Sequence, residues 1–494
     1  MADRLSERDV LLLALDTHHN PGHAGAVDVF DPAADGTPLT RDRLLDLITE
    51  RLVYVPRYRK RVRTVPGALG TPVWVDDADF DLSFHVRSAA LPAPGTPEQL
   101  AEFVGRVSAG RLDRSRPLWE LYLVEGLGGG RTALVWKTHP VLVDGIDAVD
   151  LGQLLLESDP IPDEAEESPF GTEWRPEPEP GPLGLLAGAA LEAGGGLPSL
   201  LPRARRGATE ALGAVVAVTE AVGGTAGAVG DLLGAFVHGG RPPTDSPLGG
   251  AASQQRRWAA LDLPLARLQE LRAKGQAAGA QEDTLGAVTI NDIVLTVLTG
   301  ALRAWLTGRG AAPRRSELVA LAPMSVRDVD GEPSSLGSSV APLLMSLPVG
   351  EPNPLLRLQQ VAFDTRAYKD TGRAVGARDI SEIAGFAPAT LQALAVRAAL
   401  GSRRRPYDLM VTNVPGPQHK VYAGTAPLAA TWPVLPLAAG HLLAAGLTSY
   451  DGRVHLGLTA DRDKLADLAA LAEGVPDAVD ELAEALDRRQ EGAR

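Results

Sequence analysis

The spacing of apolar residues along the chain predicts a mixed α/β fold. Short apolar or alternating runs bounded by turn residues are typical of strands. Such runs are found at 24–30, 119–124, 132–136, 258–263, 318–322, 444–448 and 454–459. Apolar residues three and four positions apart predict helices over 5–15 and 41–52, and a third that begins at 289–292 and ends before Gly308. Ser6 is the expected N-cap of the first helix.

The C-terminal half of the sequence carries three further local signals. Pro264 opens a helix that is expected to end near Gly275. Asp451-Gly452 predicts a hairpin between the strands at 444–448 and 454–459. Pro476 is expected to interrupt the C-terminal helical segment.

A predicted hairpin of two strands leads into a cluster of polar residues at 137–145. Trp119 begins the first strand, a glycine run at 126–130 makes the hairpin, and 132–136 returns. The polar segment 137–145 follows, and a helix-like stretch begins at Ala148. Because polar clusters between a buried strand and a helix commonly carry chemistry, we place the candidate site in 137–145.

Length and composition predict two lobes joined by a linker. A chain of 494 residues with 45% hydrophobic residues is too long for one ordinary core. Pro, Glu and Asp dominate from Ser158 to about Pro182, which predicts an exposed linker. We therefore expect an N-terminal lobe at 1–157, a linker and crossover at 158–255, and a C-terminal lobe at 256–494. The Gly/Ala-rich part of the crossover, 184–240, is expected to form soft helices that pack on protein, with contact to lipid as the alternative.

Charge and cysteine content exclude several classes of function. A formal net charge of −14 argues against nucleic acid as a main partner. The chain has no cysteine, which excludes disulfides, thiolate nucleophiles and cysteine-ligated metals and fits a reducing cytoplasm. Three histidines lie within 18–23, but they flank an Asn-Pro-Gly turn and have no matching further ligand, so no metal is expected. No stretch is long and apolar enough to span a membrane, so any membrane contact is expected to be peripheral.

Several sequence blocks, in order along both predicted lobes, resemble the bacterial wax ester synthase/diacylglycerol acyltransferase family. The blocks lie at 20–25, 72–87, 112–120, 137–145, 291–292, 323–327 and 410–417. That family belongs to the chloramphenicol acetyltransferase-like superfamily, which includes the condensation domains of peptide synthetases. The resemblance implies two chloramphenicol acetyltransferase-like lobes with a tunnel between them.

The block at 137–145 resembles the HHxxxDG motif, in which the second His is the general base. Here His139 occupies the first His position and Pro140 the second. Proline cannot accept a proton, and adjacent residues of an extended segment point to opposite faces, so His139 does not simply replace the missing ring. For His139 we expect a structural role, with residual base catalysis as the alternative. By resemblance Asp144 is a scaffold carboxylate, with Arg327 as our inferred partner, and Gly145 permits a tight turn.

The resemblance also suggests substrate-binding residues. Asn291 and Asp292 either cap a helix or line the mouth of the active site. Trp119 is either a core residue or a tunnel wall, and Asn413 belongs to a matching loop. The basic segment 56–63 is either a solvated surface or a contact for coenzyme A or lipid headgroups.

The resemblance implies an O-acyltransferase that moves a fatty acyl group from acyl-CoA to diacylglycerol or a long-chain alcohol. Acyl-CoA is then the donor substrate, and no bound cofactor is expected. Loss of the general base lowers a rate roughly 100- to 10,000-fold. The alternative is therefore a catalytically degenerate paralogue that binds acyl-CoA, lipid or a protein partner. Altered chemistry on a carrier-bound substrate, as in condensation-like domains, is a third possibility. The expected location is cytoplasmic, with peripheral membrane or lipid-droplet contact.

Overall fold

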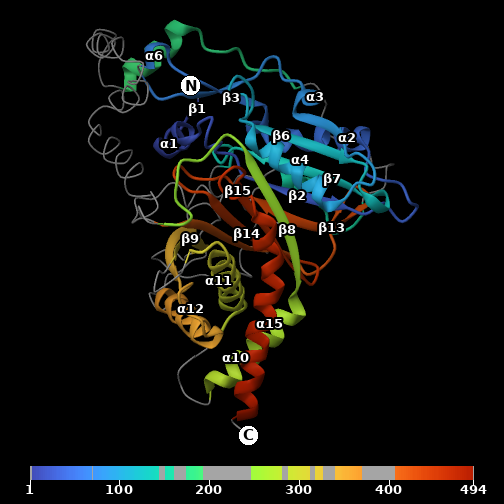
Figure 1. Ribbon diagram of the computed structural model, residues 1–494. Coiled ribbons are helices and arrows are strands. Elements are labelled where there is room, and N and C mark those ends of the chain that lie inside the picture. Colours follow the sequence, from blue (N-terminus) through green and yellow to red (C-terminus); the bar gives the residue numbers. More distant parts are fainter. Residues whose placement is uncertain are drawn as a thin grey trace.

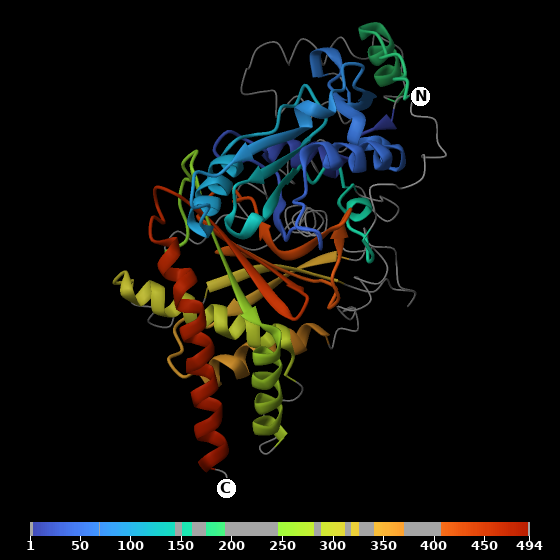
Figure 2. The same ribbon diagram turned by 90° about the vertical axis from the view of Figure 1, so that its right-hand side faces the viewer.

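In the described part of the chain, the computed structural model contains two six-stranded sheets and one three-stranded sheet, with helices packed on them (Figure 1). It describes residues 3–68, 70–143, 151–160, 174–192, 246–280, 288–311, 318–325, 340–369 and 407–492. Figure 2 shows the N-terminal sheet above the C-terminal sheet, with the long helices of the C-terminal half below both.

The N-terminal sheet contains the strand that precedes the candidate site. In spatial order its strands are β12 (Tyr422–Ala423), β13 (Ala426–Val434), β2 (Gly25–Phe30), β7 (Thr132–Thr138), β6 (Trp119–Glu125) and β5 (Val86–Ala90). β6 and β7 form the predicted hairpin, with Trp119 opposite Thr138. Every side chain of β7 is buried, as expected for a central strand that is covered on both faces.

The C-terminal sheet is also mixed. Its spatial order is β10 (Val340–Leu347), β9 (Leu318–Ser325), β11 (Leu409–Pro415), β14 (Leu443–Tyr450), β15 (Arg453–Asp461) and β8 (Arg256–Pro264). The β14–β15 turn confirms the predicted Asp-Gly hairpin, because Asp451 and Gly452 both have positive φ, at 41° and 78°. The small third sheet orders β1 (Asp3–Arg4), β4 (Val73–Asp76) and β3 (Lys60–Arg63).

Helices pack on both large sheets. Those of the N-terminal half include α1 (Glu7–Leu15), α2 (Arg41–Arg51), α3 (Leu82–His85), α4 (Pro97–Ala109), α5 (Leu151–Leu155) and α6 (Pro182–Glu192). The short 3-10 turns of this half are η1 (Leu52–Tyr54), η2 (Pro56–Arg59), η3 (Pro66–Ala68) and η4 (Gly128–Gly130). Those of the C-terminal half include α10 (Leu265–Ala280), α11 (Ile290–Gly308), α12 (Pro354–Lys369) and α15 (Leu468–Gly492). Buried residues of these four helices form one hydrophobic cluster with the C-terminal sheet.

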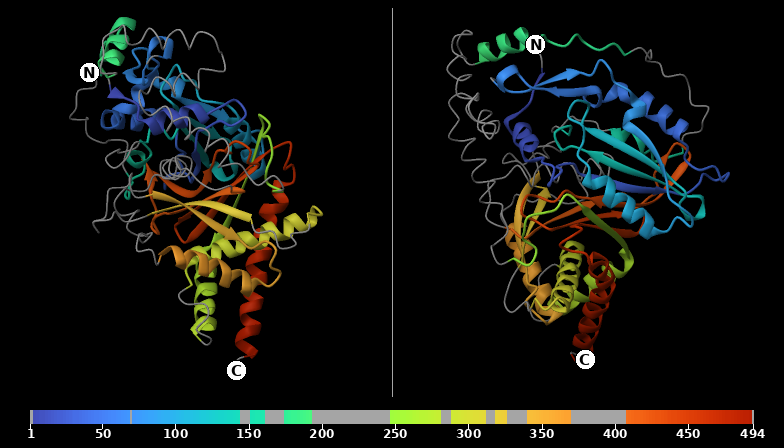
Figure 3. Two further views of the ribbon diagram at one scale, coloured as in Figure 1. Left: turned by 90° about the vertical axis from the view of Figure 1, so that its left-hand side faces the viewer. Right: turned by 45° about the horizontal axis from the view of Figure 1, so that its top comes forward.

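The sheets do not follow the predicted lobe boundary at residue 256. β12 and β13 come from the C-terminal half of the sequence, yet β13 pairs antiparallel with β2, with Thr431 opposite Asp28. Figure 3 shows these late strands crossing to the N-terminal sheet. The two halves therefore share a sheet, and β13 fixes their relative position.

Local sequence signals predicted some helix starts and fewer helix ends. Ser6 is the N-cap of α1 in a full capping box, as predicted. Two predictions were wrong. α10 continues past Gly275 to Ala280, and α15 runs through Pro476 instead of being interrupted there. The buried face of α15 includes Val475 and Val479 on either side of Pro476, and this packing compensates for the lost backbone hydrogen bond.

The end of the Pro/Glu-rich segment lies against the predicted basic segment 56–63. Glu179 forms ion pairs with Arg61 and Arg63, and the Arg59 guanidinium lies 4.7 Å above the Trp174 ring. These three arginines are therefore paired with protein groups and are not fully solvated. Residues 161–173 and most of 184–240, on which the remaining linker and lipid-contact predictions fall, lie outside the described residues.

Candidate functional site

The candidate site begins where β7 ends, at the junction of the two halves. The His139 backbone N–H donates to Leu118 O at 3.0 Å, and Leu142 N–H donates to His139 O at 2.9 Å, so the chain turns sharply after the strand. Val141 and Leu142 pack in the N-terminal core. Val143 instead packs in a cluster with residues of the C-terminal half, including Leu321, Tyr407 and Met410. The segment therefore spans the boundary between the two cores.

The His139 ring is held by its own loop. Its side chain is buried, with the residue 1% exposed, and Nδ1 accepts a hydrogen bond from Val141 N–H at 3.2 Å. Because Nδ1 acts as the acceptor, the neutral ring carries its proton on Nε2. Nε2 faces the chain around Gly22, where an added Cβ would lie 3.3 Å from it. This geometry suits a ring that orients the loop.

Pro140 is buried in the turn that follows the strand, so the position of the missing second histidine is a structured part of the site. Asp144, Gly145 and Arg327 lie outside the described residues, so the scaffold roles expected for them stay predictions. The role of His139 as an orienting residue also stays a prediction.

A second imidazole, that of His23, lies opposite His139 on the neighbouring segment of an antiparallel bridge. Ala24 and Thr138 exchange backbone hydrogen bonds of 3.0 and 2.8 Å in an antiparallel bridge. One step further along this bridge, His23 comes opposite His139, where side chains of neighbouring strands share one face. His23 is buried, and its pKa lies well below the ordinary value because burial disfavours the charged ring and the Lys137 ammonium repels it. His23 is therefore neutral at physiological pH.

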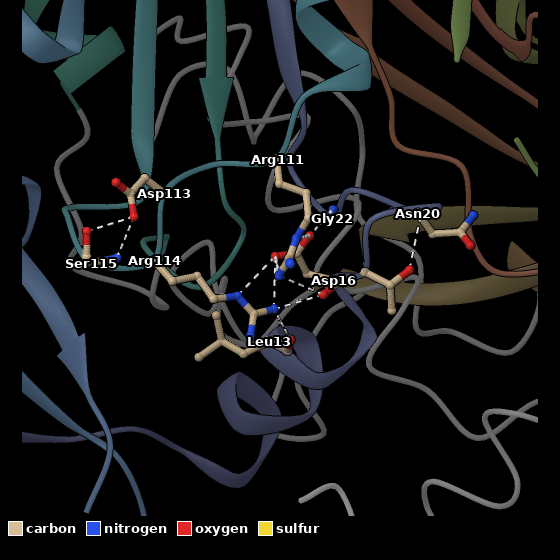
Figure 4. Close-up of polar contacts among 9 residues, drawn as sticks. Leu13, Asp16, Asn20, Gly22, Arg111, Asp113, Arg114 and Ser115 are labelled. Atoms are coloured by element: carbon tan, nitrogen blue, oxygen red, sulfur yellow. Dashed lines mark hydrogen bonds and ion pairs between the residues drawn. The ribbon is translucent and has the colours of Figure 1, made fainter. Parts of the chain in front are cut away.

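Asp16 anchors the loop that leads to His23, and Figure 4 shows its contacts with two arginines and Gly22. Its carboxylate accepts from Arg111 Nη2 at 3.0 Å, from Arg114 Nη2 at 2.9 Å and from Gly22 N–H at 3.0 Å. Burial raises the pKa of Asp16, but the bonds from both arginines and the nearby His139 ring lower it to about 2. Asp16 is thus a fixed negative charge beside His139, with two arginines to balance it.

A buried ion pair between Lys137 and Glu120 lies close to His139. Lys137 comes two residues before His139, and residues two apart in an extended chain point to the same face. Lys137 Nζ donates to Glu120 Oε2 at 3.1 Å and to Gly110 O at 2.9 Å. Glu120 also accepts from Arg87 Nη2 at 3.1 Å and from the Tyr122 hydroxyl at 2.9 Å. Burial lowers the pKa of Lys137, although the Glu120 carboxylate opposes this shift.

This ion pair forms part of the wall of a pocket between α4 and the N-terminal sheet. The pocket has a volume of about 370 Å³. Its lining residues are Arg87, Phe103, Arg106, Val107, Gly110, Arg111, Glu120, Tyr122 and Lys137. Arg111 belongs both to this pocket and to the Asp16 cluster, so the two features are adjacent. The predicted tunnel between the lobes stays a prediction.

The predicted substrate-binding residues fall into two groups. Asn413 Nδ2 donates to Asn291 Oδ1 at 2.9 Å in an exposed pair where β11 and α11 meet. Asp292 is instead a structural residue, because it completes a capping box with Thr289 and accepts from Thr365 Oγ1 at 2.6 Å. The helix cap is therefore Thr289. Of Asn291 and Asp292, only Asn291 reaches the surface.

Trp119 lies in the N-terminal core. It is 1% exposed, its indole N–H donates to Tyr58 O at 2.9 Å, and its ring stacks on His85 with centroids 4.6 Å apart. Its side chain is occupied by protein neighbours, which corresponds to the core interpretation and not to a tunnel wall.

Sequence reasoning missed Asp16, Arg111, Glu120 and His23 as parts of the site. One signal was available for the ion pair: with the hairpin turn at 126–130, Glu120 and Lys137 come directly opposite each other. Opposite charges at paired positions inside an apolar hairpin indicate a buried salt bridge. Asp16 and Arg111 are far apart in sequence, and no local pattern joins them.

Comparison with known proteins identifies the family of this chain. Residues 5–294 match the family model described as the wax ester synthase/diacylglycerol acyltransferase catalytic domain, and residues 336–483 match the corresponding C-terminal domain. The chain belongs to the wax ester synthase/diacylglycerol acyltransferase family. One relative is a putative diacylglycerol O-acyltransferase of Mycobacterium bovis, 32% identical, with 94% of this chain and 92% of that protein aligned. Another is a probable diacylglycerol O-acyltransferase of Mycobacterium tuberculosis, 30% identical over 98% of this chain and 99% of that protein.

Solved structures confirm the fold expected for a member of this family. The wax ester synthase/diacylglycerol acyltransferase of Marinobacter aquaeolei VT8 matches with a TM-score of 0.63 at 23% identity, covering 98% of this chain and all of that one. The first condensation domain of the calcium-dependent antibiotic synthetase matches with a TM-score of 0.52 at 15% identity, covering 98% of this chain and 97% of that one. The predicted α/β, chloramphenicol acetyltransferase-like architecture is therefore confirmed.

Proposed function

We propose that this protein is an O-acyltransferase that transfers a fatty acyl group from acyl-CoA to diacylglycerol or a long-chain alcohol, forming triacylglycerol or a wax ester. Family membership over both lobes supports the acyltransferase activity, and the names of the mycobacterial relatives support diacylglycerol as an acceptor. The observation that carries the proposal is the variant motif loop itself. It lies at the junction of the two cores, with two imidazoles and two ion clusters built around it.

The reaction requires a proton acceptor. The acceptor hydroxyl oxygen attacks the thioester carbonyl, the C–S bond breaks, and the hydroxyl proton ends on the coenzyme A sulfur. Pro140 cannot take part, and the tautomer of His139 set by Val141 N–H already carries a proton on Nε2. His23 is neutral and opposite His139, so it is the imidazole that we assign to proton acceptance.

Labelled acyl-CoA with diacylglycerol or hexadecanol tests the activity directly. We expect ester formation above a no-enzyme control, strongly reduced by His23→Ala. Pro140→His restores the general base of the motif, so the rate should rise by about 100-fold or more. Pro140→Ala is the matched control, because it removes the proline ring without supplying a base. No ester with any of several chain lengths and acceptors would overturn the proposal.

Pro140 itself favours one alternative, a catalytically degenerate paralogue that binds acyl-CoA, lipid or a protein partner. This alternative predicts stable acyl-CoA binding with no turnover, and no gain from Pro140→His. Equilibrium dialysis with labelled acyl-CoA, read together with the ester assay, separates the two functions.

For location, the proposal is a cytoplasmic protein with peripheral contact to a membrane or lipid droplet. No helix in the described parts of the chain has the length and apolar character to cross a bilayer. α6 is a short apolar helix that packs through Leu185 and Ala189, while Leu183 is 79% exposed near its start. Flotation with vesicles that contain diacylglycerol tests this, with Leu183→Asp expected to reduce binding and Phe363→Asp, at another exposed apolar residue, as the control.

A further inference from the structure

The pocket between α4 and the N-terminal sheet carries a strong local excess of positive charge. Its lining contains four cations, Arg87, Arg106, Arg111 and Lys137, and one carboxylate, Glu120. This imbalance stands out in a chain whose formal net charge is −14. Clustered arginines with a concave surface are suited to multiply charged anions, because each guanidinium presents a planar set of donors.

The four cations are not equally satisfied by protein groups. Arg87 and Lys137 share Glu120, and Arg111 pairs with Asp16. Arg106, on the last turn of α4, is exposed at the rim and has no side-chain partner among the described residues. The inner cations are therefore held in place, and Arg106 is available for a ligand.

The other side of the pocket is apolar and aromatic. Phe103 and Tyr122 meet edge to face with ring centroids 6.0 Å apart, and Val107 lies beside them. A volume of about 370 Å³ is within the usual range for small-molecule sites and larger than one inorganic anion needs. The pocket thus offers cations for phosphate and an apolar surface for a flat ring.

The position of the pocket relates it to the candidate active site. Tyr122 pairs with Val135, which lies four residues before His139 on the chain. At about 3.3 Å per residue this separation is roughly 13 Å along the strand direction. The pantetheine arm of coenzyme A can span such a distance between its nucleotide and its sulfur.

We propose that this pocket binds the phosphorylated adenosine end of the coenzyme A donor, with Arg106 contacting a phosphate and the adenine packing against the apolar wall that Phe103 and Tyr122 form together. The substrate assignment rests on the proposed function, but the binding site itself does not. Arg106 acts here in binding and takes no part in bond breaking.

The test uses adenosine 3′,5′-bisphosphate, which has the nucleotide and no acyl group. Calorimetry with the full-length protein should show binding that weakens at least tenfold in Arg106→Ala and more in Arg106→Glu, and that is largely retained in Arg106→Lys. Arg488→Ala is the matched control, because Arg488 is an exposed helical arginine on α15. Binding should also weaken as salt rises.

Further ligands distinguish the source of the phosphate. Adenosine 5′-monophosphate should bind more weakly than the bisphosphate, and adenosine and inorganic phosphate each much more weakly. In the ester assay, Arg106→Ala should raise the KM for acyl-CoA with little change in kcat. Equal binding of inorganic phosphate and bisphosphate would overturn the nucleotide assignment, and equal binding by the Arg106 and Arg488 variants would overturn the site.

Failure of this inference is separable from failure of the proposed function. Arg106-dependent bisphosphate binding without any ester formation would leave the pocket in place and remove the activity. Ester formation whose KM for acyl-CoA does not respond to Arg106 would leave the activity and remove the pocket.

Discussion

Glu120 and Lys137 face each other across the β6–β7 ladder, and their side chains form a buried ion pair of 3.1 Å. Each charge depends on the other, because both are shielded from water by α4 and the sheet. Removal of Glu120 leaves the Lys137 ammonium as an uncompensated buried charge, which costs about 3–5 kcal/mol.

We therefore expect Glu120→Gln to lower the free energy of unfolding by about 3–5 kcal/mol, measured by urea denaturation. The double variant Glu120→Leu with Lys137→Met should recover much of this loss, because it removes both charges. Asp31→Asn is the control: it breaks the exposed Arg131–Asp31 pair and should change stability by less than about 1 kcal/mol. A loss below about 1 kcal/mol in Glu120→Gln would contradict the burial of the pair.

Asp16 makes stability depend on acid pH. Its folded-state pKa of about 2 lies below the ordinary value of 3.8, so its contribution is present above about pH 4 and is lost as pH falls toward 2. The shift corresponds to about 2 kcal/mol. Asp16→Asn should be less stable by about this amount at pH 7 and should lack this part of the acid transition. The control is Asp46→Asn, at an exposed aspartate, which should behave like the wild type. Unfolding curves from pH 2 to 7 provide the comparison.

Asp28 gives the opposite dependence. Burial raises its pKa to about 7, although Thr431 and Trp136 both donate hydrogen bonds to its carboxyl group. The folded state therefore holds a proton that the unfolded state releases near pH 4, and stability falls as pH rises from 4 to 7, by roughly 4 kcal/mol at most. Asp28→Asn mimics the protonated form, so it should stabilise the protein at pH 8 and flatten this slope. An unchanged slope would show that Asp28 is ionised in the folded protein.

The exposed Asn291–Asn413 pair tests the predicted substrate-binding role. Asn413→Ala should alter the free energy of unfolding by no more than about 1 kcal/mol, because a single exposed neutral hydrogen bond contributes little. If the pair contacts substrate, the same variant should raise the KM of the acceptor several-fold. Gln269→Ala, at an exposed amide on α10, is the control. Unchanged kinetics in Asn413→Ala would restrict the pair to joining β11 and α11.

Local patterns predicted part of the secondary structure and missed α4 and α12. Apolar alternation located β2, β6, β7, β8, β14 and β15, and capping chemistry located α1. The continuation of α15 through Pro476 was missed because it depends on packing against the C-terminal core, which no local rule records. For the same reason, pattern alone gave no sign that β13 pairs with β2.

The site was predicted only in part. The position of His139 at a strand end follows from the order of elements, and the departure at Pro140 is visible in the sequence. The partners of His139 come from distant segments: Asp16 follows α1, Arg111 follows α4, and His23 precedes β2. These residues are brought together only by the tertiary fold. The Glu120–Lys137 pair alone could be predicted from the sequence, because the register of the hairpin places the two residues opposite each other.

The placement of β13 has a consequence for how the chain can be divided. Thr431 completes the hydrogen bonding of Asp28, and Trp258 of β8 donates to Pro433 O at the end of the same strand. A fragment that stops before residue 422 would leave β2 as an open sheet edge with an acidic side chain half satisfied. Fragments 1–421 and 422–494 should therefore purify as one complex when they are co-expressed. Neither fragment should be soluble when it is produced alone.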